Sequence, residues 1–316
     1  MYRKIDFHAH YLSPGYKKFL KEKFNDHADD CPTPAYSIDT TLSTMERQRI
    51  DYTIISASAP HFSVAYDANQ TAEMTAEVND YGAEQQEHYP DKIGFAASLP
   101  LPYVEESLSE IDRALSKNTV AFTLPTNANG TYLGNPDLDP IMSKLNEHHA
   151  LVLLHPNEPH PATKNMSSKI NIAVMGFFFD TTRAVVNMTV NDIFTKYPNI
   201  KFIIPHAGAL LPVISDRVAL SKKMNSELTD SQVDVPGVMA NQYFDVAGKV
   251  LPYQLPTLLQ MVNPNHLLYG TDSPYTPAPL VDHLAKTLAD TDVVSEPMKQ
   301  MIFYDNGKQL LDSLKR

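Results

Sequence analysis

The sequence predicts an α/β protein of the (β/α)₈ barrel class, and three observations favour that class. Eight short apolar runs recur along the 316 residues, and most end in a polar or Gly/Pro-rich turn. Several runs are continuously apolar, as is typical of parallel strands buried on both faces. Helical patterns lie between the runs, and strand–helix alternation repeated eight times is typical of a closed barrel. The alternative, an open doubly wound sheet, is disfavoured because no Gly-rich phosphate loop follows the first run.

The expected elements follow in order along the chain. The eight expected strands are residues 3–10, 52–60, 92–100, 120–127, 151–157, 201–208, 243–248 and 266–274. The expected helices are residues 41–50, 69–89, 104–118, 135–150, 181–198, 209–228 and 279–290, with a closing helix at 301–314. Asn135 followed by Pro136 is typical of an N-cap and a first helical residue.

Two segments interrupt this regular spacing, residues 11–38 and residues 156–180. Both follow a strand, so both belong to the face where barrels place their active sites, and long connections there are usually functional. We therefore expect residues 1–316 to form a single barrel domain whose two loop insertions cover the active-site mouth.

The composition indicates which binding partners and which cellular compartment are expected. The formal net charge is 26 − 37 = −11, and no Lys/Arg-rich run is present, which disfavours nucleic acids and anionic membrane surfaces as partners. The single cysteine, Cys31, excludes an intramolecular disulfide and fits a reducing compartment. No signal-peptide core and no membrane-length apolar run are found. We expect a soluble, cytoplasmic protein.

Polar side chains follow the apolar runs where the expected strands end. His8 and His10 end the first strand, His155 the fifth, His206 the sixth and Asp272 the eighth. Residues i and i+2 of a strand point to the same side, and the carboxyl ends of all barrel strands meet at one mouth. Three imidazoles and a carboxylate suit a borderline divalent ion such as Zn²⁺, with a position left open for water or substrate.

Each of these residues also has a simpler interpretation. A lone His-x-His pair is more often hydrogen-bonded or exposed than metal-binding, and Asp272 could cap a helix. Five such residues at barrel strand ends together favour the metal site. His61 follows the second strand on the same face and is an intermediate case. The other histidines are interpreted as loop or helix-surface residues: His27, His88, His148, His149, His160, His266 and His283.

The ordered set FHAH, LLHP, PHAG and YGTDSP resembles the amidohydrolase superfamily. The closer likeness is to its metal-dependent decarboxylase branch, the amidohydrolase-2 family. That branch includes aminocarboxymuconate semialdehyde decarboxylase and the γ-resorcylate, 5-carboxyvanillate and 6-methylsalicylate decarboxylases. The resemblance extends over nearly the whole chain, through residues 122–145, 176–188 and 196–212 to the terminal FYDNGKQLL, where Gly307 stands in place of the usual Ala.

The resemblance implies roles for particular residues. His8, His10, His155 and Asp272 correspond to metal ligands, and His206 to the residue beside the metal-bound water or the substrate. Two-metal members carry a carboxylated lysine at the end of the fourth strand; here that strand reads VAFTLPTN, so one metal ion is implied. Zn²⁺ is favoured, Mn²⁺ is the alternative known in close relatives, and no organic cofactor is expected.

Further residues are candidates for binding a substrate. Arg217 lies eleven residues after His206, a spacing at which the family places an arginine that grips a carboxylate, in some members across a subunit boundary. The resemblance thus implies a homodimer or homotetramer, although Arg217 could instead be a surface residue. Phe177, within FFF, could cover a flat ring. His61 and Arg47 could hold polar substituents or a carboxylate of the substrate.

The leading functional hypothesis is a metal-dependent, non-oxidative decarboxylase of a small aromatic or unsaturated carboxylic acid. In it, Asp272 delivers a proton to carbon before CO₂ leaves, and His206 tunes the charge of Asp272 or holds a water. The alternative is a one-metal hydrolase of a lactone or amide, in which a metal-activated water attacks the carbonyl. A third hypothesis, a metal-binding protein without activity, is disfavoured by the intact ligand set.

Overall fold

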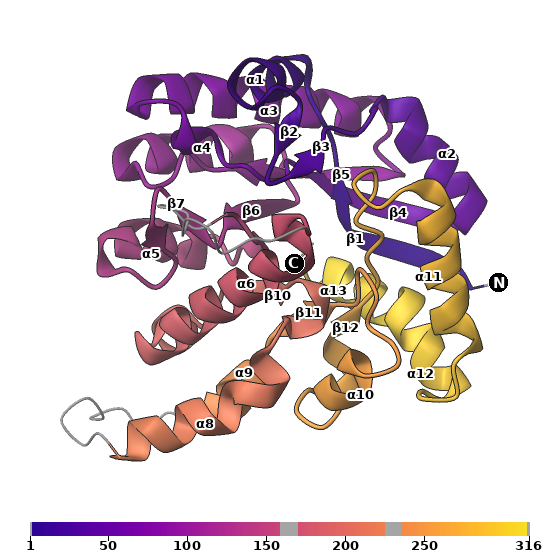
Figure 1. The fold of residues 1–316 in the computed structure, drawn as a ribbon. Helices are drawn as coiled ribbons and strands as arrows, with labels where there is room; N and C mark the ends of the chain where they lie inside the picture. Colours follow the sequence, from indigo (N-terminus) through magenta and orange to yellow (C-terminus); the bar gives the residue numbers. More distant parts are fainter. Residues whose placement is uncertain (1, 159–169, 225–234, 315–316) are drawn as a thin grey trace.

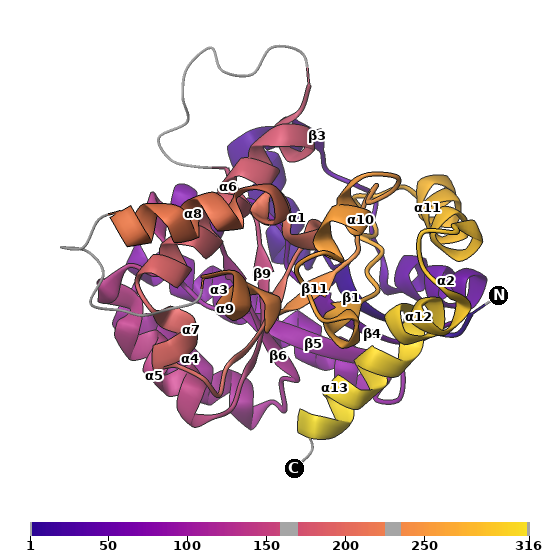
Figure 2. The ribbon, with the colours of Figure 1, turned by 90° about the horizontal axis from the view of Figure 1, so that it is seen from below.

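A computed structural model of the protein describes residues 2–158, 170–224 and 235–314. Eight parallel strands form its main sheet, which curves into a nearly closed barrel with helices around it (Figures 1 and 2). In spatial order the strands are β1 (Lys4–His10), β4 (Ile50–Ser56), β5 (Ile93–Ser98), β6 (Ala121–Pro125), β9 (Leu151–His155), β10 (Lys201–Ile204), β11 (Tyr243–Asp245) and β12 (Leu267–Leu268). Each coincides with or overlaps one of the eight apolar runs, although β4 begins two residues before the run expected there, so the predicted (β/α)₈ barrel is confirmed.

Hydrogen bonds between β1 and the chain around β12 close the ring. The backbone N–H of Phe7 donates to the carbonyl of Tyr269 at 2.9 Å, and that of His10 donates to the carbonyl of Ser273 at 2.7 Å. Because Asp272 lies between these two links, the closure holds it beside the end of β1, where His8 and His10 are.

The described helices surround the sheet (Figure 1). They are α1 (Pro14–Phe24), α2 (Ile38–Gln48), α3 (Ala68–His88), α4 (Val104–Ser116), α5 (Asp139–Glu147), α6 (Ile172–Val190), α7 (Ile193–Lys196), α8 (Leu211–Met224), α9 (Val235–Ala240), α10 (Gln254–Leu258), α11 (Ala278–Asp290), α12 (Glu296–Gln300) and α13 (Asn306–Leu314). The Asn135 cap is present, since its side chain accepts a hydrogen bond from the N–H of Asp137. It begins a 3₁₀ turn that leads into α5.

Two apolar clusters hold the layers together. The larger packs the strands against the surrounding helices. The smaller joins Ile5, Ile54 and Leu151 of the strands to Leu310 of α13. Tyr52 and Val120, near the start of their strands, pack against this smaller cluster. The closing helix therefore covers the amino ends of the strands and leaves the carboxyl ends for the site.

The two insertions are more regular than loops. Residues 11–38 contain α1 and a short hairpin of β2 (His27–Ala28) and β3 (Cys31–Pro32). In the second insertion, residues 159–169 lie outside the described residues, whereas α6 begins at Ile172, nine residues before the helix expected there. The amphipathic pattern is hidden at its start because Val174, Met175 and Phe179 are apolar yet exposed. The phenylalanines of FFF are thus on a helix and not on a loop.

In the part of the chain that the structure describes, no helix combines the length and the apolar character needed to span a bilayer.

Candidate metal centre

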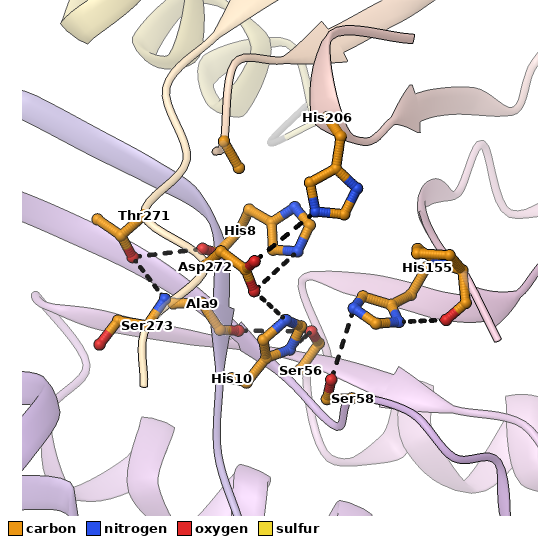
Figure 3. A network of polar contacts seen from close by, with 12 residues as sticks. His8, Ala9, His10, Ser56, Ser58, His155, His206, Thr271, Asp272 and Ser273 are labelled. Atoms are coloured by element: carbon orange, nitrogen blue, oxygen red, sulfur yellow. Dashed lines mark hydrogen bonds and ion pairs between the residues drawn. The ribbon is translucent and has the colours of Figure 1, made fainter. Parts of the chain in front are cut away.

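Four histidines and one aspartate converge at the carboxyl ends of the strands (Figure 3). One potential ligand atom from each of His8, His10 and His155 lies within 4.8 Å of the others, and the same holds for His8, His206 and Asp272. Nε2 of His10 is 3.2 Å from Oδ1 of Asp272, and Nε2 of His206 is 3.7 Å from its Oδ2. The structure therefore brings together all five residues that the strand ends predict.

The imidazoles of His8, His10 and His155 are each held by a contact at Nδ1. Nδ1 of His8 lies 2.9 Å from the Asp245 carboxylate, that of His155 lies 2.8 Å from the Pro156 carbonyl, and that of His10 lies 3.3 Å from the Ser56 hydroxyl. These contacts turn the Nε2 atoms toward one another. A partner on one ring nitrogen that fixes the orientation of the other is a common arrangement around metal-binding histidines.

Several nitrogens in the centre have no hydrogen-bond partner among the described residues. Nε2 of His8, Nε2 of His10 and Nδ1 of His206 are all buried in this way. Buried polar atoms without a partner are costly and call for an explanation, such as an ion. With the Asp272 carboxylate beside them, the two Nε2 atoms suit one divalent metal ion, so the donor set fits the metal implied by the sequence.

The electrostatics of His10, His155 and Asp272 match a metal-binding role. Burial lowers the pKa of His10 and lowers that of His155 well below its ordinary value, so both are neutral donors. Burial disfavours the charge of Asp272, but the interactions of its carboxylate with the nearby imidazoles of His10 and His206 outweigh this and hold the pKa of that carboxyl well below its usual range. Burial likewise opposes charge on His8, yet Asp245 overcomes it and raises the pKa of His8 to about 9.

The turns that carry His206 and Asp272 have an unusual backbone. Both residues have a left-handed φ, 53° for His206 and 56° for Asp272, a conformation that costs an L-residue roughly 1–2 kcal/mol. The N–H of His206 donates to Oδ1 of Asp245 at 3.0 Å, and Gln254 donates to the His206 carbonyl at 2.5 Å. Such strain persists where surrounding contacts impose it, and functional sites are common places for it.

Two buried aspartates support the centre, and the sequence analysis gave neither a role. Asp245 ends β11 and contacts both His8 and the backbone of His206. Asp6 accepts hydrogen bonds from the N–H of His8 and from the hydroxyl of Thr271, the residue before Asp272. A signal for Asp245 was present, because it is the polar residue at the end of the seventh strand.

Of the candidate substrate residues, Phe177 lies at the centre. Its ring centroid is 6.1 Å from that of His155, and the neighbouring Phe178 stacks on His206 with centroids 6.0 Å apart. His61 is close by, in a small pocket that His155 also lines. However, its Nε2 is 2.9 Å from the Leu99 carbonyl and its Nδ1 is 2.9 Å from the Ser63 hydroxyl, so contacts within the protein occupy both nitrogens.

The two candidate arginines differ in what the structure shows of them. Arg47 is in the last turn of α2, three residues before β4 begins, and its Nε is 2.8 Å from Asp282. A residue that immediately precedes a strand lies at its amino end, opposite the mouth, so the structure does not bring Arg47 to the centre. Arg217 is exposed on α8, a helix that contacts α6 and α9 (Figure 2).

Comparison with known proteins agrees with this geometry. A family model described as Amidohydrolase matches residues 5–312. The chain belongs to the amidohydrolase family. Among curated relatives, it is 26% identical to 6-methylsalicylic acid decarboxylase of Penicillium expansum, over 97% of this chain and 95% of that protein. It is 23% identical to gamma-resorcylate decarboxylase of Polaromonas sp., over 86% of each chain.

Solved structures share the fold of this amidohydrolase. The crystal structure of an amidohydrolase II superposes with a TM-score of 0.93 at 43% identity, over 98% of this chain and 99% of that one. The 2,6-dihydroxybenzoate decarboxylase of Rhizobium superposes with a TM-score of 0.82 at 18% identity, over 99% of each chain. A dihydroxybenzoic acid decarboxylase of Polaromonas sp. that holds manganese has a TM-score of 0.82 at 20% identity, over 100% of this chain and 98% of that one.

Proposed function

We propose that this amidohydrolase is a metal-dependent, non-oxidative decarboxylase of a small aromatic or unsaturated carboxylic acid. The observation that carries the proposal is the cluster of His8, His10, His155 and His206 around Asp272, with buried Nε2 atoms that lack a partner. The curated relatives that match over most of the chain include decarboxylases of 6-methylsalicylic acid and γ-resorcylate, which support an aromatic acid as substrate.

One divalent metal ion is part of this proposal. His8, His10, His155 and Asp272 would hold it, and when bound it supplies a positive charge that orients and polarises the substrate carboxylate. Three imidazoles favour Zn²⁺. Mn²⁺ is the alternative, since two structurally similar decarboxylases contain manganese. The proposed reaction uses no organic cofactor.

Proton transfer to carbon is the step that the chain itself performs. Loss of CO₂ from the substrate carboxylate alone would leave a carbanion. If the ring or alkene carbon is protonated beforehand, the C–C bond can break to give a neutral product. Asp272 delivers this proton, so a C–H bond forms, the bond to the carboxyl group breaks, and CO₂ leaves. Because the pKa of Asp272 lies well below its usual range in the free chain, the proton reaches it from the substrate or a water on binding.

His206 and the α6 phenylalanines complete the proposed site. His206 Nε2, 3.7 Å from Asp272, favours the charged carboxylate and can hold a water beside it. Phe177 and Phe178 give the site an apolar side against which a flat ring can pack. We also propose that Arg217, exposed on α8, binds a carboxylate of the substrate, in its own subunit or in a neighbouring subunit of a homodimer or homotetramer. We propose that the enzyme works in the cytoplasm.

One observation favours a second candidate function, hydrolysis of a lactone or amide. An ionised Asp272 is a ready general base for a metal-activated water, whereas decarboxylation requires that it first gain a proton. The two reactions share the same histidines, and they differ in product.

CO₂ release tests the proposal. The protein, loaded separately with Zn²⁺ and Mn²⁺, is assayed against ortho-hydroxy aromatic acids and aminocarboxymuconate semialdehyde. The proposal predicts CO₂ release that a chelator abolishes and that His8→Ala lacks. Acid production from a lactone panel, without CO₂ from any acid, would replace the decarboxylase by the hydrolase.

A further inference from the structure

Helix α6 places two adjacent phenylalanines on two different histidines. The Phe177 ring meets His155 edge-on, at 76° between ring planes, and the Phe178 ring lies nearly parallel to His206, at 20°. Consecutive helical residues point about 100° apart. A single helix can contact both histidines only at one position and one rotation, so whatever fixes α6 also fixes this side of the site.

On the His155 side, α6 is held by Asp180, whose carboxylate is fully buried. It accepts hydrogen bonds from the Thr126 hydroxyl, from Nδ2 of Asn127 at 3.1 Å and from the Tyr132 hydroxyl at 2.5 Å. A buried carboxylate is unfavourable unless donors surround it. Here the three donors come from one segment, residues 126–132, which follows β6.

Thr126 joins this carboxylate to the strand end that carries His155. Its N–H donates to the His155 carbonyl at 2.9 Å, and its hydroxyl oxygen accepts the N–H of Asn157 at 3.1 Å. Thr126 and Asn157 are both buried. One threonine therefore connects the backbone of His155 with Asp180, three residues after Phe177.

On the His206 side, α6 is held by Thr182. Its hydroxyl donates to the Phe178 carbonyl at 2.7 Å and accepts the N–H of Leu210 at 3.1 Å. Leu210 follows the left-handed turn that begins at His206. The same hydroxyl thus links the turn of α6 that carries Phe178 to the segment that carries His206.

We infer that Asp180 and Thr182 are positioning residues of the site, Asp180 setting Phe177 against His155 and Thr182 setting Phe178 against His206. Loss of the Asp180 contacts moves the Phe177 ring away from the position of the substrate ring and weakens substrate binding. Loss of the Thr182 contacts frees the His206 ring beside Asp272 and slows proton delivery. The expected changes in KM and kcat rest on the proposed function, whereas the placement of α6 by these two residues does not.

The test compares Asp180→Asn and Thr182→Val with two matched controls in the metal-loaded full chain. Asp91→Asn makes the same change at an exposed carboxylate that precedes β5, away from α6. Thr287→Val removes a hydroxyl that donates to the His283 carbonyl within α11. We expect a roughly tenfold higher KM with kcat within about threefold for Asp180→Asn. We expect a roughly tenfold lower kcat with KM within about threefold for Thr182→Val. Both controls keep wild-type values.

Amide hydrogen exchange in α6 gives a readout that does not need turnover. Faster exchange over residues 174–182 in the two variants, with exchange in β4 and β5 unchanged, supports the inference even if the wild-type protein releases CO₂ from no acid. Tyr132→Phe removes a single donor and replaces Asp180→Asn if that variant does not fold. Folded variants with wild-type α6 exchange, or with equal losses in kcat and KM for both substitutions, would overturn the inference.

Discussion

The Asp245 carboxylate lies 2.9 Å from Nδ1 of His8, and both side chains are buried. Because Nδ1 is the donor in this pair, Nε2 of His8 points into the cluster of histidines. The other carboxylate oxygen of Asp245 accepts the N–H of His206. One aspartate on β11 therefore orients the imidazole of β1 and fixes the backbone of a second histidine.

Asp245→Asn weakens metal binding without removing a ligand. The amide is a poorer acceptor and can reverse the orientation of the His8 ring, and partners of this kind are typically worth about 10–100-fold in metal affinity. A chelator competition titration measures the loss. Asp216→Asn, a change at an exposed residue of α8, is the matched control and leaves affinity unchanged. Wild-type affinity in Asp245→Asn would contradict the orienting role.

Gly270→Ala disturbs the centre through His8. A Cβ at residue 270 would lie 2.7 Å from Cβ of His8 and 3.1 Å from Cβ of Ala247, so the backbone of the ligand must move. We expect lower metal affinity together with lower stability. Metal titration and urea unfolding on the same sample measure the two effects.

Gly307→Ala serves as the comparison for that variant. Its Cβ would lie 2.6 Å from the Phe7 ring, in the apolar core and away from the ligand atoms. Overpacking of this kind costs about 1–3 kcal/mol of unfolding free energy. We expect this loss with metal affinity unchanged. An equal loss of affinity in both glycine variants would show that general destabilisation, and not displacement of His8, weakens the site.

His61 makes the protein less stable in acid. Burial lowers the pKa of His61 from 6.5 to about 4, so between these values the unfolded chain takes up a proton that the folded chain does not. The contribution of His61 to the free energy of unfolding is therefore fully present above pH 6.5. It falls by up to about 3 kcal/mol as the pH drops to 4. His61→Asn can still cap the turn at Ser63 but does not titrate. Urea unfolding from pH 7 to pH 4.5 should show a smaller loss in the variant, and parallel curves would refute this role.

The barrel and the five central residues could be predicted because one physical rule determines both. Strands buried on both faces appear as apolar runs, and a polar residue at the carboxyl end of a run reaches the shared mouth. His8, His10, His155, His206 and Asp272 all follow this rule. Asp245 follows it too, but a lone carboxylate at the end of a three-residue strand has no metal-ligand spacing to distinguish it.

Other features depend on contacts that a sequence does not display. The first half of α6 could not be recognised because its exposed residues, Val174, Met175 and Phe179, are apolar. His61 has the strand-end position of a site residue, yet the Leu99 carbonyl and the Ser63 hydroxyl occupy its nitrogens. Arg47 could have been placed at the amino end of β4, since it precedes the strand directly.

The most direct test of the central claim compares CO₂ release by the wild-type protein and Asp272→Asn, each at measured metal content, with the best acid of the panel. Our account predicts that the variant, corrected for its metal content, loses turnover by about 10³-fold or more, because an amide cannot deliver the proton to carbon. Full turnover by a metal-loaded Asp272→Asn protein would contradict the account, since another group would then protonate the substrate.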